Sequence, residues 1–241
     1  MGSGLYSAVS GAMSRLQMMD TISDNLSNGQ TAGFKKGGVS FEAILERPRR
    51  PEDARGIDYA RIKEGFTDFA QGSLTRTGLP LQVAIEGEGF FKVQDRDGQV
   101  FFTRQGLLRR DASGNLLTPQ GMRLLGEDGR PLVFPSEDVV IDEEGMAAFP
   151  EGDKVRIPVY QVADEKKLVR VGGAFRDGGE SPATLMERPR VFQGYTEDSN
   201  VKATEEMVRM MEALRVFEAC QKVMKNYSEL DGKVIELGVV G

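Results

Sequence analysis

The chain has 241 residues, 39% hydrophobic and 28% charged, and a formal net charge of −6, the composition of a soluble globular protein. The negative charge argues against a dedicated nucleic-acid binder, which usually carries a basic face. There is no histidine, which excludes a Ser-His-Asp triad, a Cys-His pair and any histidine-ligated metal. The single cysteine, Cys220, excludes an intrachain disulfide. No stretch approaches the roughly 20 apolar residues of a membrane span, and the N-terminus lacks the pattern of a cleaved signal peptide.

The first predicted element is an amphipathic helix over residues Leu5 to Leu26. Its apolar side chains recur at alternating intervals of four and three residues, which keeps one stripe facing a partner helix. Asn28 and Gly29 then suit a left-handed helix end. The stripe consists of Leu5, Val9, Ala12, Leu16, Met19, Ser23 and Leu26.

The middle of the chain is predicted to be β-structure. Residues 36–75 are expected to form an extended or loop connector, with an exposed loop over 46–56 and extended structure or a short hairpin over 57–69. From Leu81 onward, apolar and polar residues alternate as in half-buried strands. Acidic turns recur with glycines 15 or 16 residues apart, which leaves room for two short strands each and predicts an antiparallel meander or a small barrel. These turns are Asp97-Gly98, Ser113-Gly114, Asp128-Gly129 and Glu144-Gly145.

A second, longer helix is predicted from Thr204 to Leu237, and it carries two apolar stripes. A helix with two apolar stripes needs more than one neighbour, so we predict that both terminal helices form an assembly interface. A simpler alternative is that the two ends only pack on each other within one monomer. One stripe runs through Ala213, Val216, Cys220, Val223, Tyr227, Leu230, Val234 and Leu237, and the other through Met207, Met210, Leu214 and Phe217.

Together these elements predict an α+β protein. The N- and C-terminal helices are expected to pack as a coiled-coil-like pair, with a central antiparallel all-β domain. The predicted boundaries are 1–35 for the N-terminal helix, 36–75 for the connector, 76–195 for the β-domain and 196–241 for the C-terminal helix.

The charged motifs have simple interpretations. The acidic turns could suggest calcium, but the loop beginning at Asp95 has Gly106 where an EF-hand places its glutamate. Plain hairpin turns are therefore predicted, with no catalytic residue, cofactor or metal. Two basic clusters, Lys35-Lys36 and Arg47, Arg49 and Arg50, are interpreted as solvated surface, with contact to an acidic neighbouring subunit as the alternative.

Three ordered motifs resemble the signatures of bacterial flagellar rod and hook proteins. The first is Ser23–Asn28 followed by Thr31–Lys35, the second is Pro80–Phe91 continued by Thr103–Gly106, and the third is Gly194–Val201. The resemblance spans nearly the whole chain and favours the proximal-rod type, with the distal-rod type as second choice. The signature residues are Asn25, Leu26, Asn28, Thr31, Gly33, Phe34, Gly194, Tyr195, Ser199, Asn200 and Val201.

The resemblance implies a structural subunit of the flagellar basal-body rod in the periplasm. Such a subunit polymerises into the axial drive shaft that transmits torque. Its implied partners are copies of itself, other rod and hook subunits and the flagellar type III export apparatus, through which it passes without signal cleavage. No nucleic acid, membrane span or enzyme activity is implied. The alternative is a periplasmic glycan-binding or peptidoglycan-modifying β-domain protein with helical flanks.

Two local expectations complete the prediction. In a dilute monomer, residues before Gly33 and after Asn200 are expected to be mobile, because long helices gain most of their stability from packing. Gly33 is expected to need a positive φ, although it looks exposed in the sequence.

Overall fold

The computed structural model describes residues 2–45, 58–178 and 182–239, and the side chains of 2–3, 41–64 and 231–239 are not described. The loop predicted over 46–56 lies outside these residues. The chain forms two compact units. The helical unit contains residues 1–27, 37–68 and 202–241, and the β unit contains 28–36 and 69–201.

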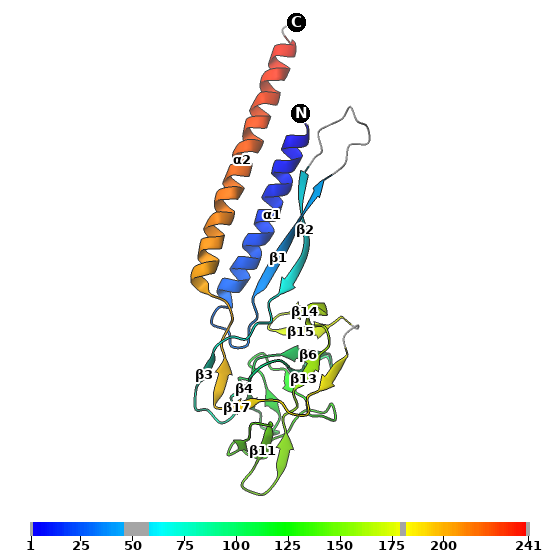
Figure 1. Ribbon diagram of the computed structural model, residues 1–241, viewed down its shortest axis with the longest axis vertical. Coiled ribbons are helices and arrows are strands. Elements are labelled where there is room, and N and C mark those ends of the chain that lie inside the picture. Colours follow the sequence, from blue (N-terminus) through cyan, green and yellow to red (C-terminus); the bar gives the residue numbers. More distant parts are fainter. Residues whose placement is uncertain (1, 46–57, 179–181, 240–241) are drawn as a thin grey trace. The chain divides into compact units, whose positions relative to one another are not determined.

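The helical unit consists of two long helices and a two-stranded ribbon (Figure 1). Helix α1 spans Gly2–Ser27 and packs against helix α2, which spans Ala203–Val239. Strands β1 (Gly37–Leu45) and β2 (Asp58–Thr67) pair antiparallel and pack on α1. The predicted helix pair is confirmed, and the ribbon lies in the segment for which a connector is predicted.

The β unit is built from short antiparallel strands around an open seven-stranded sheet. The order in that sheet is β14-β15-β6-β5-β9-β8-β7, so hairpins β5–β6 and β14–β15 lie beside the meander β7–β8–β9. The strands of the unit are β3 (Leu74–Arg76), β4 (Val83–Ile85), β5 (Phe91–Gln94), β6 (Val100–Thr103), β7 (Arg109–Arg110), β8 (Leu116–Leu117), β9 (Arg123–Leu124), β10 (Val140–Ile141), β11 (Met146–Ala148), β12 (Lys154–Arg156), β13 (Tyr160–Val162), β14 (Leu168–Val171), β15 (Ala174–Asp177), β16 (Ala183–Leu185), β17 (Val191–Gln193) and β18 (Tyr195–Glu197). A short 3-10 helix, Glu165–Lys167, precedes β14.

The acidic turns close these hairpins as predicted. In the first, the Asp95 carboxylate accepts hydrogen bonds from the backbone N–H groups of Asp97 (2.9 Å) and Gln99 (2.8 Å). Gly98 adopts a φ of 82°, a conformation that favours glycine. The same arrangement recurs at Asp111 and Asp142, whose carboxylates also accept from N–H groups two and four residues later.

Two apolar clusters fill the β unit. The larger one joins strands from the whole unit and includes fully buried Phe91, Leu124 and Phe134. The smaller one is aromatic, and its Phe90 and Phe175 rings lie 6.2 Å apart in an edge-on arrangement. The predicted α+β class with a central antiparallel β-domain is confirmed. None of the described helices is long and apolar enough to cross a membrane.

Candidate assembly site

The two helices meet along a seam to which α1 contributes small residues such as Gly4 and Gly11. A Cβ added to Gly4 would clash with the Tyr227 hydroxyl group, and one added to Gly11 would lie 3.3 Å from the Cys220 sulfur. The absence of a side chain at Gly4 and Gly11 therefore makes room for the Tyr227 and Cys220 side chains of α2. On α1 the seam lies one position before the predicted stripe. On α2 it runs through buried or half-buried residues at intervals of four and three: Glu206, Met210, Ala213, Phe217, Cys220, Met224 and Tyr227.

Some side chains of the predicted α1 stripe are buried and others are exposed to solvent. Ala12 is buried, and Leu5, Met19 and Leu26 are half-buried. Val9 and Leu16 are exposed at 37% and 45%, while Ala8 and Ile22 are buried instead. Val9 and Leu16 therefore do not pack against α2 within the chain, and their place in an assembly interface stays a prediction.

The predicted α2 stripes are divided in the same way. Met210, Phe217 and Tyr227 are half-buried in the seam. The side chain of Val234 lies outside the described residues. The exposed members of the two stripes are Met207, Leu214, Val216, Val223 and Leu230, and Val208 and Met211 are exposed beside them. The role of these residues in assembly stays a prediction.

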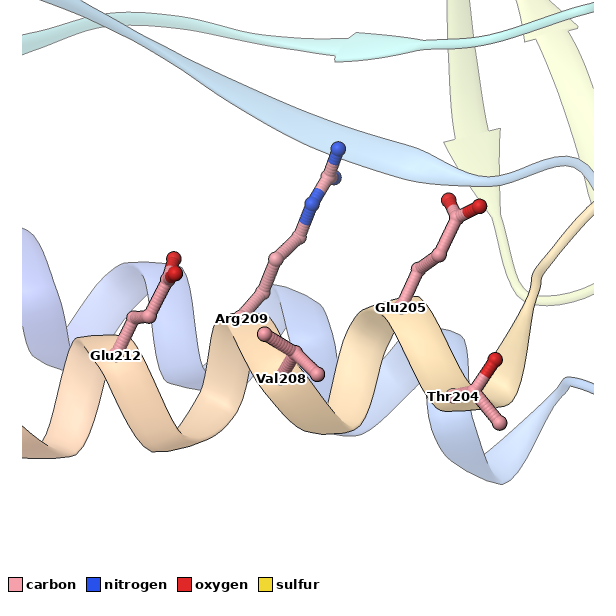
Figure 2. Close-up of a pocket in the computed structure, with 5 residues that line it drawn as sticks. All are labelled: Thr204, Glu205, Val208, Arg209 and Glu212. Carbon is pink, nitrogen blue, oxygen red and sulfur yellow. The ribbon is translucent and has the colours of Figure 1, made fainter.

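A row of charged side chains borders this apolar surface at the start of α2. Figure 2 shows Glu205, Arg209 and Glu212 projecting from one side of the helix, around a shallow hollow that Thr204 and Val208 also line. The spacing of four and three residues explains why they share a face. This row accompanies apolar side chains such as Val208, which is 50% exposed.

A buried polar network ties the helical unit together at the end of α1. The Asn25 amide donates to the Gly37 carbonyl (2.9 Å) and to the Glu206 carboxylate (3.0 Å), and its oxygen accepts from the Gly37 N–H (2.8 Å). Asn25 and Glu206 are each 1% exposed. Arg209 donates to the second carboxylate oxygen of Glu206 at 3.3 Å. One amide thereby joins the end of α1, the start of β1 and the first turn of α2.

The β unit contains a buried cluster of three charges. The Glu197 carboxylate receives the Lys35 ammonium at 2.6 Å on one oxygen and the Arg104 guanidinium at 2.9 Å on the other. All three side chains are at most 3% exposed. Lys35 also donates to the Ala70 carbonyl, and Arg104 donates to the carbonyls of Gly87 and Gly89. Buried charges need such partners, because an unpaired one is costly.

The interpretation of Lys35 as a solvated surface residue is wrong. Burial lowers the pKa of the Lys35 ammonium, and the nearby Glu197 carboxylate acts in the opposite direction. Arg170 stacks its guanidinium 4.4 Å from the centre of the buried Phe34 ring and donates to the Lys35 carbonyl. Hydropathy alone could not separate Lys35 from its half-buried neighbour Lys36.

Gly33 holds the segment 28–36 in place. Its φ of 70° confirms the expected positive value, but the residue is buried, so the expectation of an exposed site is wrong. A Cβ there would meet the backbone of Gln105 and Arg104 at 2.6 and 2.7 Å. The Gly33 N–H donates to the Glu197 carbonyl at 2.7 Å.

The remaining signature residues form local contacts in the β unit. Asn200 accepts from the Lys36 N–H at 2.6 Å and donates to the Ala70 carbonyl at 3.0 Å. Gly194 accepts from the N–H groups of Thr77 and Gly78. The structure places the others as follows: the Thr31 N–H donates to the Asn28 carbonyl, the Tyr195 ring contacts Phe192, the Ser199 hydroxyl accepts from the Val201 N–H, and Val201 is buried.

Sequence reasoning missed the roles of Lys35, Arg104, Glu197 and Glu206. Their positions could have pointed to a role. Lys35, Arg104 and Glu197 each lie in one of the three motifs quoted above, and Glu206 follows the third. Each of the three motifs thus contributes one charged residue to a shared buried site.

Three family models match successive parts of the chain. Residues 5–35 match "Flagella basal body rod protein", residues 84–157 match "Flagellar hook protein FlgE/F/G D1 domain", and residues 193–237 match "Flagellar basal body rod FlgEFG protein C-terminal". Each matched region contributes one residue of the Lys35–Glu197–Arg104 cluster.

Curated relatives match over nearly their whole length. The flagellar basal-body rod protein FlgF of Mesorhizobium japonicum is 27% identical over 240 residues, covering 98% of each chain. The flagellar basal-body rod protein FlgG of Borreliella burgdorferi is 29% identical over 253 residues, covering 95% of this chain and 96% of its own. FlgG of Bacillus subtilis is 26% identical over 259 residues, covering 97% and 98%.

Proposed function

We propose that the chain assembles through the outward faces of its two terminal helices. It belongs to the family of flagellar basal-body rod proteins of the FlgF/FlgG type and is a structural rod subunit. The observation that carries this proposal is the exposure of large apolar side chains on both helices. Tyr6 and Met13 on α1 are each 63% exposed, and Met207, Met211 and Leu230 on α2 are 52–56% exposed. Apolar surface of this kind marks sites of association.

The geometry of such an assembly follows from the asymmetry of the surfaces. Contacts between two different faces that do not close into a ring generate an open helical filament. A filament that transmits torque needs packed helices and no chemical step, so we assign no enzyme activity to the subunit. Its neighbours are copies of itself and other rod and hook subunits.

The route to the basal body is part of the proposal. We infer that the subunit leaves through the flagellar type III export apparatus and joins the periplasmic rod without cleavage of a signal peptide. The intact mass of the subunit taken from isolated basal bodies tests this, because a shortened N-terminus would contradict it. The preference for the proximal-rod FlgF type over the distal-rod FlgG type stays a prediction. The alternative of a glycan-binding or peptidoglycan-modifying protein has no support among the relatives.

Replacing an outward apolar residue by aspartate tests the interface directly. Leu16→Asp and Leu230→Asp change side chains that are 45% and 56% exposed in the single chain, so the monomer is expected to fold. In a packed interface the same unpaired charge costs about 3–5 kcal/mol. We expect the rod to be absent and swimming to be lost, while the circular dichroism melt of the β unit is unchanged.

Matched controls place the same charge on exposed polar positions of the same helices. Gln17→Asp and Gln221→Asp are suitable, because both residues are exposed in the helical unit. Normal rods in the Leu16 and Leu230 variants would contradict the proposed interface. Loss of rods in all four variants would mean that added negative charge, not the apolar surface, decides the result.

A further inference from the structure

Segment 28–36 belongs to the β unit, and three of the hydrogen bonds that hold it there are made with residues 197–200. Gly33 donates to the Glu197 carbonyl at 2.7 Å, and the Asn200 N–H donates to the Phe34 carbonyl at 3.4 Å. The Lys36 N–H donates to the Asn200 side chain at 2.6 Å. No strand is assigned within residues 28–36, so these bonds take the place of a strand ladder, together with the contacts of Arg170 to the Phe34 ring and the Lys35 carbonyl.

The charges at this junction are unequal in number. Among the described residues, Glu197 is the carboxylate that forms ion pairs with both Lys35 and Arg104, at 2.6 and 2.9 Å, and it also accepts from the Gly72 N–H at 3.0 Å. The half-buried Glu165 carboxylate acts on the same two cations only through space. Arg104 is additionally held by the carbonyls of Gly87 and Gly89, both at 2.6 Å. Besides Glu197, the Lys35 ammonium donates to the Ala70 carbonyl at 2.8 Å. Lys35 therefore depends more on Glu197 than Arg104 does.

We propose that the Lys35–Glu197–Arg104 cluster is a lock that docks residues 28–36 on the β unit only when strand β18 is in place. Without the Glu197 carboxylate, two cations face each other in a buried site. Arg104 keeps its backbone carbonyls and stays. Lys35 is on a segment without a strand and moves to water, taking Gly33 and Phe34 with it. Strand β18 pairs with β3 at Glu197↔Leu74, so the lock joins the two ends of the unit's sequence.

Hydrogen exchange measured by mass spectrometry on the full-length monomer tests the lock. We compare a peptide covering residues 28–36 with one covering the β5–β6 hairpin. In Glu197→Gln, exchange in the 28–36 peptide is expected to rise about a hundredfold, because breaking a buried pair costs at least two tenfold steps. Exchange in the β5–β6 peptide is expected to change less than about threefold, since local openings are separate from global unfolding.

A matched control removes a charge from the next position of the chain. Asp198 is half-buried and accepts from the Ser73 and Thr75 hydroxyls. Asp198→Asn is expected to leave exchange of the 28–36 peptide unchanged. If Asp198→Asn matches Glu197→Gln, general loss of charge on the strand explains the effect and the lock is wrong.

The double variant Lys35→Met with Glu197→Gln separates a lock from a general defect. Removing both charges leaves no unpaired ammonium, so protection of the 28–36 peptide is expected to recover by about tenfold or more relative to Glu197→Gln alone. This test holds even if Glu197→Gln folds poorly, because rescue is then measured as recovered folding. Absence of rescue, or an equal rise in exchange in both peptides, would overturn the proposal.

Discussion

The two units of the chain differ in how they use apolar side chains. Among the described residues, the β unit buries large aromatic and branched side chains, including Phe90, Phe91 and Phe134, at 1% exposure or less. The helical unit buries mostly small or polar ones, such as Ala8, Ala12, Asn25 and Ala213, with Ile22 as the large exception. Many of its larger apolar residues, among them Tyr6, Met13 and Leu230, are exposed.

The size of the buried side chains indicates how stable each unit is without partners. Burial of a large apolar side chain contributes about 1.5–3 kcal/mol, whereas an alanine contributes far less. The β unit is therefore expected to be stable by itself. The helical unit leaves many apolar side chains exposed, as expected of a subunit that buries them against its neighbours on assembly.

The largest expected difference between the units is in hydrogen exchange of the monomer. Amides of α1 and α2 are expected to exchange more than about a thousandfold faster than those of β5 and β6, because local opening ranges from almost free to the full cost of unfolding. The sequence places the N-terminal boundary of the mobile part at Gly33. The structure places residues 28–36 in the β unit, so we now expect the boundary at Asn28. Strong protection of both helices in a proven monomer would contradict the comparison.

A smaller effect is expected from valine at Gly33. A β-branched residue at a φ of 70° is strained by about 1–3 kcal/mol, and its Cβ would also meet the Gln105 backbone. Gly33→Val should therefore reduce the swimming-halo diameter more than Ser113→Lys, which changes an exposed hairpin tip. Protein level and export are measured alongside. Equal halos would remove the conformational role of Gly33.

The smallest effect is expected at a hairpin turn of the β unit. Hydrogen bonds from the Asn115 side chain and from the N–H groups of Asn115 and Ser113 hold the pKa of the Asp111 carboxyl below its ordinary value of 3.8. A lowered pKa contributes stability above pH 3.8 that is lost as the pH falls through the folded-state value. Urea midpoints of wild type and Asp111→Asn should differ slightly at pH 7 and converge below pH 3.8. A difference that persists at low pH would show that the charge is not responsible.

The sequence predicted the parts that depend on local pattern. Both helices follow from apolar periodicity, and their ends differ from the predicted ones by at most three residues. The hairpin turns at Asp95 and Asp111 follow from side chains that bind their own backbone. The positive φ of Gly33 follows from its place after a helix end, whereas the left-handed helix end predicted at Asn28 and Gly29 is wrong, because neither residue has a positive φ.

The sequence could not predict what depends on a partner distant in the chain. Lys35 and Glu197 are 162 positions apart, and a lysine beside another lysine has the pattern of a surface. The helix seam was placed one position away because Gly4 and Gly11 pack closely without being apolar signals. The predicted stripe included Val9 and Leu16 because they are large and apolar. Both residues lie on the exposed face that we propose for contact with neighbouring subunits.

The methionines on the outward helix faces expose the free subunit to oxidation. The thioethers of Met13, Met207 and Met211 are accessible in the single chain, at 52–63% exposure of the residue. Oxidation converts a flexible apolar side chain into a polar sulfoxide. In the rod proposed above, the same atoms are buried between helices, so oxidants reach the subunit before it assembles and not afterwards. Oxidation of free subunits is therefore expected to lower the number of subunits that keep an apolar surface able to join the rod.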